Sequence, residues 1–307
     1  MAFLMRLAFY INPPSQLNFE FIEPYTKLFL SIPTTQLSPI ANVSVAAVLV
    51  FIQALLFNRV INNHGLVAKP GYLGALVYIV TSSLFLPFLI ISPPLVCNFL
   101  LIWLIDKFLK LGKSNQPHRM LYDSGMIIAI GALIYFPFSV MLLLIWLSLI
   151  MSRPFNWREW IMGPLGFLTI FFFLAVFYYW NDNINQFYKI WTPLANGFPA
   201  VFIINYSDYF SLIPVILILV LASIQLREKY FKSFIHTRRA FQILFFMFIV
   251  AFLSVYAKPN FRIYHFLLCI PSGSVLLAYY FSNARIKWFY ESIFLVLFLT
   301  IQYFLFV

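Results

Sequence analysis

The sequence predicts an all-α, polytopic helical membrane protein, and three observations lead to this fold class. Of the 307 residues, 63% are hydrophobic and 9% are charged, whereas a soluble globular domain carries about 25% charged residues. Apolar runs recur from residue 40 onward, each roughly 17 to 25 residues long and able to cross a hydrocarbon core of about 30 Å. The runs also lack the alternation of a membrane β-barrel, whose strands span roughly ten residues.

The first element is a short apolar segment over residues 3–11, which gives only about 14 Å of helix. We expect it to be interfacial, half-spanning or the remnant of a longer helix, because no signal-peptide cleavage site follows it. A loop over 13–39 comes next. About ten membrane helices are then predicted, over 40–58, 71–91, 94–111, 121–136, 138–152, 160–180, 208–226, 240–257, 263–282 and 289–307. Residues 1–307 thus form one predicted membrane domain, with a segment and outer loop over 1–39 and a helical bundle over 40–307.

Residues 121–152 are predicted to form a helical hairpin. A single helix of this length would be about 48 Å long, which exceeds a membrane at ordinary tilt. The YFPF sequence from Tyr135 to Phe138 offers a break, because proline lacks a backbone donor and disfavours helix at the residue before it.

The distribution of basic residues favours the same break. With the hairpin, most of the twenty basic residues fall in loops on one side of the membrane, whereas a single helix divides them almost evenly. The residues on the basic side are Arg59, Lys69, Lys107, Lys110, Lys113, Arg119, Arg153, Arg158, Arg227, Lys229, Lys232, Arg238, Arg239, Arg285 and Lys287. The positive-inside rule makes this side cytoplasmic. It places 13–39, 181–207, 258–262 and the C-terminus outside, in a multi-pass protein of the inner (cytoplasmic) membrane.

The net charge of +11 is accounted for by this topology, so nucleic acid is not an expected partner. Only four histidines are present, and none has the spacing of metal ligands, so we expect no metal site and assign no cofactor. Cys97 and Cys269 lie in apolar runs, where thiols behave as small buried hydrophobes. Gln53 and Asn98 are expected to hydrogen-bond between helices.

The outer face carries the residues that could support catalysis. The stretch NFEFIEPY contains Glu20 and Glu23, in a loop too long for a simple connection. Other predicted outer segments carry the candidate phosphate- and lipid-binding residues Lys189, Lys258, Arg262 and His265. A carboxylate can take a proton from an acceptor while cations hold a phosphate. The alternative is that these are solvated charges at helix ends, with His265 as a hydrogen-bonded interfacial histidine.

The inner face carries a second candidate surface, in the stretch RPFNWREWIMGPLG. Its residues Arg153, Trp157, Arg158 and Trp160 could contact a lipid headgroup or a partner protein. The alternative is simple anchoring at the headgroup level, which tryptophan favours.

Two resemblances follow from these motifs. The segment LYDSGMIIAIGALIYFPFSVMLLLIWLSLIMSRPFNWREWIMGPLGFLTIFFF, with its motifs YDSG, YFP and WREW, resembles an uncharacterised inner-membrane family of Bacteroidota over about residues 40–180. Some of its members are labelled beta-carotene monooxygenases, which the histidine content here does not support. The layout of NFEFIEPY followed by NVSVAAVLVFIQALLFNRVINNHGLVAKPGYLGALVYIV is similar to the GT-C polyprenyl-phosphate-dependent glycosyltransferases. That resemblance implies that Glu20 or Glu23 is the catalytic base and that Arg262 binds phosphate.

The expected function is therefore cell-envelope glycoconjugate assembly, by a GT-C-like glycosyltransferase or a degenerate relative. The expected partners are membrane lipids, including a polyprenyl-phosphate-linked sugar donor on the outer face. The chain departs from the GT-C pattern because the helix before the acidic loop is truncated and no adjacent acidic pair appears. The alternative is a non-catalytic subunit of a membrane complex in secretion or envelope biogenesis, with further protein subunits as partners.

Overall fold

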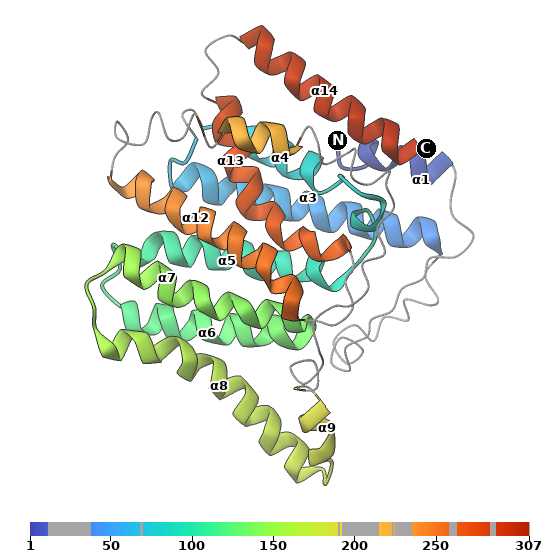
Figure 1. Cartoon of the computed structure of the whole chain (residues 1–307). Coiled ribbons are helices and arrows are strands. Elements are labelled where there is room, and N and C mark those ends of the chain that lie inside the picture. Colours follow the sequence, from blue (N-terminus) through green and yellow to red (C-terminus); the bar gives the residue numbers. More distant parts are fainter. Residues whose placement is uncertain are drawn as a thin grey trace.

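The computed structural model describes residues 1–11, 38–67, 70–189, 191, 215–222, 224, 235–257, 263–282 and 287–306. Over these residues the regular structure is entirely helical, and no strand is present. Helices α3, α5, α6, α7, α12 and α13 lie alongside one another, while α8 and α14 lie obliquely at opposite edges of the bundle (Figure 1). The all-α prediction is thus confirmed for the described residues.

Helix α3 (Pro39–Asn63) begins at an N-cap, because the Ser38 hydroxyl accepts a hydrogen bond from the amide of Ala41. Proline at the first helical position supports this start, since its missing N–H would be unpaired there anyway. Ala46, Ala47, Val50 and Ala54 are buried on one side of the helix. Small side chains at such positions let neighbouring membrane helices approach closely.

The predicted span 71–91 is wrong as one continuous helix. Helix α4 (Leu73–Thr81) has nine residues and is followed by turns and the short 3-10 helix η2 (Leu86–Phe88). The hydroxyls of Thr81, Ser82 and Ser83 bond back to carbonyls three or four residues earlier. Consecutive hydroxyl side chains compete with the helix in this way, and Pro87 then prevents its continuation.

The predicted break in 121–152 is confirmed. Helix α6 (Pro117–Ile134) ends before Tyr135, whose backbone is extended at φ −146° and ψ 106°. The 3-10 helix η3 (Phe136–Met141) and helix α7 (Leu142–Ser152) follow. Helices α6 and α7 run side by side (Figure 1). Pro137 lacks the N–H that a continuous helix would bond to the Leu133 carbonyl, so α6 cannot run on through it, and proline instead stands in the first turn of η3.

Helix α8 (Trp157–Trp180) packs on α6 through glycines. A Cβ atom built on Gly125 of α6 would lie 2.0 Å from the Gly163 carbonyl oxygen of α8. A Cβ on Gly166 of α8 would lie 2.0 Å from the Tyr122 carbonyl oxygen of α6. The two backbones therefore touch directly, as small residues permit between membrane helices.

The remaining helices complete the bundle. They are η1 (Leu4–Arg6), α1 (Leu7–Ile11), α5 (Pro93–Leu111), α9 (Ile184–Lys189), α12 (Ile235–Leu253), η4 (Ser254–Ala257), η5 (Ile263–Cys269), α13 (Ile270–Ser282) and α14 (Lys287–Phe306). Residues 215–222 are also helical. Helix α1 contacts both α3 and α14, so both termini lie at one edge of the bundle (Figure 1).

Four described helical stretches are long and apolar enough to cross a membrane, fewer than the ten predicted. They are Pro39–Asn63, Trp157–Trp180, Thr237–Ala257 and Ile263–Ser282. Helix α4 is too short at nine residues, α6 and α7 divide one apolar run, and α5 carries Asp106, Lys107 and Lys110 in its last two turns. Only part of the predicted span 208–226 lies within the described residues.

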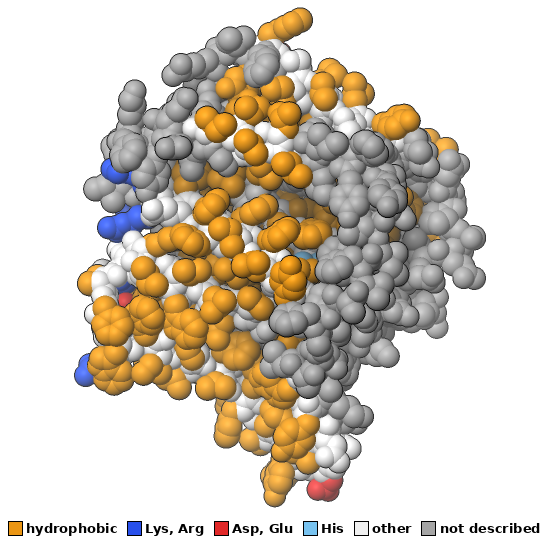
Figure 2. Space-filling view, in the orientation of Figure 1, with side chains coloured by type: hydrophobic (Ala, Val, Ile, Leu, Met, Phe, Trp, Pro, Cys, Tyr) orange, Lys and Arg blue, Asp and Glu red, His pale blue; other side chains and the backbone are white. Residues whose placement is uncertain are grey.

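The described surface is mostly apolar, as expected of a protein in lipid. Figure 2 shows hydrophobic side chains over most of the visible described face, with Lys and Arg side chains gathered at its left edge. That edge holds the connection from α7 to α8 and the start of α12 (Figure 1). Phe172, Phe173 and Phe177 of α8 are 62–65% exposed, so this helix turns large aromatic side chains outward.

We predict that Gly125→Ala destabilises the fold. The new methyl group must displace the backbone of α8, and overpacking of this kind costs about 1–3 kcal/mol. The thermal unfolding midpoint of the detergent-solubilised protein should fall. Gly112→Ala is the matched control, because a Cβ there would lie at an ordinary 3.7 Å from Ser152 and the residue already has helical φ and ψ angles. Equal midpoints for the two variants would contradict the prediction.

Candidate functional site

Most of the predicted outer-face residues lie outside the described part of the chain. This applies to Glu20, Glu23, Lys258 and Arg262. Lys189 is the last residue of α9, but its side chain is also outside the description. His265 has a described side chain, so it is the predicted outer-face residue whose surroundings can be examined.

His265 is buried in a hydrogen-bonded cluster at the junction of η3, η4 and η5. It is 1% exposed. Its Nε2 atom lies 3.1 Å from the Ala251 carbonyl oxygen and 3.0 Å from the Ser254 hydroxyl. A carbonyl oxygen only accepts, so Nε2 carries the proton, and the neutral ring accepts at Nδ1 from the Tyr135 hydroxyl at 2.8 Å. This arrangement matches the alternative of a hydrogen-bonded histidine.

A large apolar cavity adjoins this cluster. Its volume is about 670 Å³, and its wall is formed by α4, the chain before and within η2, residues 215–224, α12, η5 and α13. Phe252 and Phe266, which stack at 5.6 Å between ring centroids, form part of the lining. Ile216, Val220 and Phe252 are each about half exposed, so the cavity communicates with the surface of the described molecule.

The cavity offers little to a polar ligand. Within the described lining, the hydroxyl-bearing residues are Thr81 and Ser274, and both hydroxyls donate to carbonyls of their own helices. Cys269 contributes a buried thiol. A cavity with this lining suits a hydrocarbon chain.

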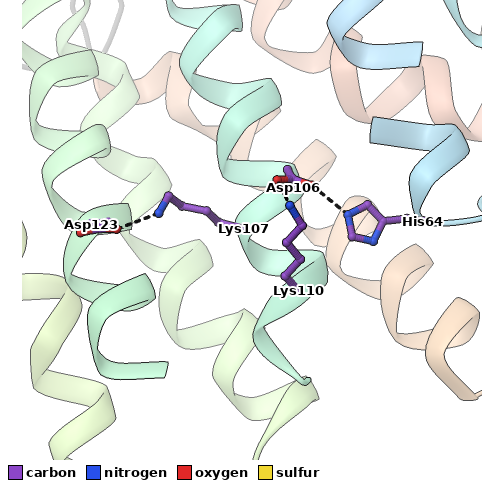
Figure 3. A network of polar contacts seen from close by, with 5 residues as sticks. All are labelled: His64, Asp106, Lys107, Lys110 and Asp123. Carbon is purple, nitrogen blue, oxygen red and sulfur yellow. Dashed lines mark hydrogen bonds and ion pairs between the residues drawn. The ribbon is translucent and has the colours of Figure 1, made fainter. Parts of the chain in front are cut away.

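A polar network lies near the C-terminal end of α5 (Figure 3). Asp106 of α5 accepts from Lys110, one turn further along, and pairs with His64 at 3.0 Å. Lys107, also on α5, donates to Asp123 of α6 at 3.0 Å. His64 caps the C-terminus of α3, so the network joins α3, α5 and α6.

A second cavity of about 500 Å³ lies against this network. Its lining residues are Asn63, His64, Leu109, Lys110, Lys113, Ser114 and Met120. The His64 side chain is 8% exposed and the Lys110 side chain 56%, so the cavity runs from a buried imidazole to an exposed amine. In contrast to the first cavity, it is rich in hydrogen-bond donors.

The predicted inner-face residues divide into two pairs. Arg153 bonds to Glu159 at 3.0 Å and to the Ser114 carbonyl at 2.9 Å. The backbone carbonyl of Trp160 accepts a hydrogen bond from the Trp146 indole. The centroid of the Trp160 ring lies 5.3 Å from that of the Phe155 ring. Arg153 and Trp160 are therefore held within the protein.

Trp157 and Arg158 instead face outward. Trp157 is 61% exposed, and the Arg158 guanidinium lies 5.8 Å from its ring centroid. An exposed tryptophan beside a cation is typical of the headgroup level of a membrane.

Sequence reasoning missed Arg6. Its side chain is fully buried, donating from Nε to the Leu89 carbonyl at 3.3 Å and from Nη1 to the Ala2 carbonyl at 2.9 Å. Nη2 has no hydrogen-bond partner among the described residues. Burial lowers the pKa of Arg6 to about 10, because desolvation disfavours the charged form. The sequence did offer a signal for this burial, since Arg6 is a basic residue inside the short apolar segment 3–11.

The described residues contain no group of three or more His, Cys, Asp or Glu side chains that could hold a metal ion.

Comparison with known proteins yields one family. A model described as a family of unknown function (DUF6427) matches residues 23–307. No curated protein and no solved structure matches the chain.

We predict that Tyr135→Phe destabilises the protein by about 1–3 kcal/mol, because a buried acceptor loses its donor. The variant removes the hydroxyl that donates to His265 Nδ1 and changes little else. Tyr179→Phe is the matched control, since Tyr179 is 74% exposed and Tyr135 only 3%. Thermal unfolding in detergent compares the two, and equal midpoints would count against a structural role for this hydrogen bond.

Proposed function

Since the chain belongs to DUF6427, a family of unknown function, we propose a function from its own cavities and charges. The protein binds the hydrocarbon chain of a membrane lipid in the 670 Å³ cavity. It acts in cell-envelope glycoconjugate assembly as a GT-C-like glycosyltransferase that uses a polyprenyl-phosphate sugar donor on the outer face. We place it in the inner membrane of a Bacteroidota envelope, with its C-terminus outside.

The apolar cavity is the observation that carries this proposal. Its volume of about 670 Å³ lies within the range of roughly 300 to 1,000 Å³ typical of ligand pockets. Thr81 and Ser274 have their hydroxyls committed to helix carbonyls, so a polar ligand would find few partners there. A polyprenyl chain needs none.

Two basic residues precede part of the cavity lining in the sequence and could hold a phosphate beside it. Phe266 lines the cavity and follows Lys258 and Arg262 by eight and four residues. On the predicted topology these cations lie at the outer surface, where the headgroup of a lipid held in the cavity would emerge. A guanidinium and an ammonium would hold its phosphate.

The proposed reaction is a direct displacement at the anomeric carbon of the sugar. Glu20 or Glu23 takes the proton from the acceptor hydroxyl. The acceptor oxygen forms the new bond to the anomeric carbon as the bond from that carbon to the phosphate oxygen breaks. Polyprenyl phosphate leaves with the electron pair, and Arg262, Lys258 and Lys189 offset its charge. His265 positions η5 through its bonds to Tyr135 and Ala251.

A second candidate function is that of a non-catalytic subunit of a membrane complex. Helix α8 supports the subunit function because it is the least covered of the four candidate spans. Only 17% of its apolar stretch is buried within the chain, against 44–83% for the other three. A partner helix could cover its exposed phenylalanines. Purification in mild detergent distinguishes the two functions, since a stoichiometric protein partner supports the subunit and a bound polyprenyl lipid supports the enzyme.

We predict that polyprenyl phosphate protects Cys269 from alkylation. In a Cys97→Ser variant, Cys269 is the one remaining thiol of the chain, and it lines the apolar cavity. A lipophilic maleimide should label it several-fold more slowly when the lipid occupies the cavity. The matched control is Cys269→Ser, in which Cys97, hydrogen-bonded to the Gly131 carbonyl outside the cavity, should label at a rate that the lipid does not change. Undiminished labelling of Cys269 at saturating lipid would exclude the cavity as its site.

We also predict that replacing both Glu20 and Glu23 with alanine abolishes sugar transfer while the protein remains folded. The readout is the envelope glycan profile of cells in which the variant replaces the wild type. Glu291→Ala is the control, because Glu291 is an exposed carboxylate placed at the opposite face by the predicted topology. An unchanged glycan profile in the double variant would refute the catalytic role.

A further inference from the structure

We propose that the second cavity, lined by His64, Lys110 and Lys113, is a binding site for a phosphate group. It is separate from the proposed sugar-transfer site. Helix α5 gives the separation between the two cavities. Asn98 bonds to the Leu267 carbonyl of η5 beside the apolar cavity, and Lys110 of the second cavity lies twelve residues further along α5. Twelve residues correspond to about 18 Å of helix.

Among the described lining residues, one cation has no carboxylate partner. Lys107 pairs with Asp123, and Arg153 pairs with Glu159. Asp106 serves both Lys110 and His64. Lys113 is exposed and makes no ion pair with the described residues. An anion in the cavity would therefore meet two ammonium groups and one nearby carboxylate already engaged with Lys110.

The polar network fixes the inner part of the cavity. His64 is almost fully buried, and its Nε2 atom is committed to Asp106 at 3.0 Å. The same carboxylate orients Lys110. Behind the lining residue Ser114, Arg153 donates to the Ser114 carbonyl, which holds the turn between α5 and α6 in place. His64 and Lys110 therefore lose little side-chain freedom on binding, whereas Lys113 must be ordered by the ligand.

The start of α6 adds to the positive potential. Ser114 lies just before this helix and Met120 lies in its first turn, and both line the cavity. Pro117 has no N–H and the Met120 amide bonds to the Gln116 carbonyl, so it is the dipole of the helix, not a free amide at the cavity, that favours an anion at this end.

The lining also limits the class of ligand. The described lining contains no Phe, Tyr or Trp, and its one aromatic ring, the His64 imidazole, is 8% exposed, so a nucleobase has little surface on which to stack. Leu109 and Met120 supply apolar contact beside the cations. Phosphate suits this set, because lysine binds it as a point charge. Trp103 of α5 is 54% exposed, with the Lys107 ammonium 5.6 Å from its ring centroid, which is typical of the headgroup level. The phosphate can thus come from an anionic lipid headgroup or from a soluble phosphate.

The test uses the full chain in neutral detergent. Inorganic phosphate is titrated by calorimetry, and phosphatidylglycerol is compared with phosphatidylcholine by native mass spectrometry. We expect phosphate or phosphatidylglycerol to bind and phosphatidylcholine to bind more weakly. Lys113→Gln should reduce the affinity about fivefold, equivalent to about 1 kcal/mol for one lysine near the surface. It should leave the unfolding midpoint unchanged, because Lys113 holds no other element.

Arg59→Gln is the matched control. Arg59 is an exposed cation on α3 near the same end of the bundle, but it does not line the cavity. Binding of inorganic phosphate would identify a soluble ligand, and binding of phosphatidylglycerol alone would identify a headgroup; either outcome supports the site. Absence of both, or an equal loss in Arg59→Gln and Lys113→Gln, would overturn the proposal, because it would leave only general attraction to a basic surface.

Discussion

A polar group surrounded by hydrocarbon is costly to bury without a partner inside the protein, and helix α5 supplies several such partners. The Leu95 carbonyl accepts from Gln53 of α3, Cys97 donates to the Gly131 carbonyl of α6, and Asn98 donates to the Leu267 carbonyl of η5. At its far end, Asp106 and Lys107 reach α3 and α6. Because the association of apolar helices in lipid gains little from the hydrophobic effect, these directional bonds set which helices are neighbours.

The two ends of α5 consequently have different chemistry. Near Asn98 the surroundings are apolar, and the hydrogen-bonded pair Tyr135 and His265 closes the core beside the large cavity. Near Asp106 the side chains are charged, and the adjoining cavity is polar. One helix thereby runs from the neighbourhood of an apolar cavity to a polar one.

The sequence predicted those features that depend on local rules. The helical class followed from the long apolar runs, and the break at Tyr135 followed from Pro137 and the charge distribution. It failed where contacts between distant residues decide. The pairing of His64 with Asp106 spans 42 residues and has no sequence signal. The end of α4 is different, because it is set by local hydroxyl bonds three or four residues back that the surrounding apolar run obscured. The acidic loop with Glu20 and Glu23 lies outside the described residues, so that part of the site stays a prediction.

The packing of the first residues against the last helix also constrains how the protein is made. Met5 accepts a hydrogen bond from Gln302, 297 residues later, and Arg6 beside it is fully buried. At about 5–20 residues per second, translation takes about 15–60 s to reach this partner. Arg6 can reach its Leu89 partner much earlier, whereas the contact of Met5 with Gln302 must wait for the last helix. The N-terminal segment is thus joined to the early helices first and to α14 last.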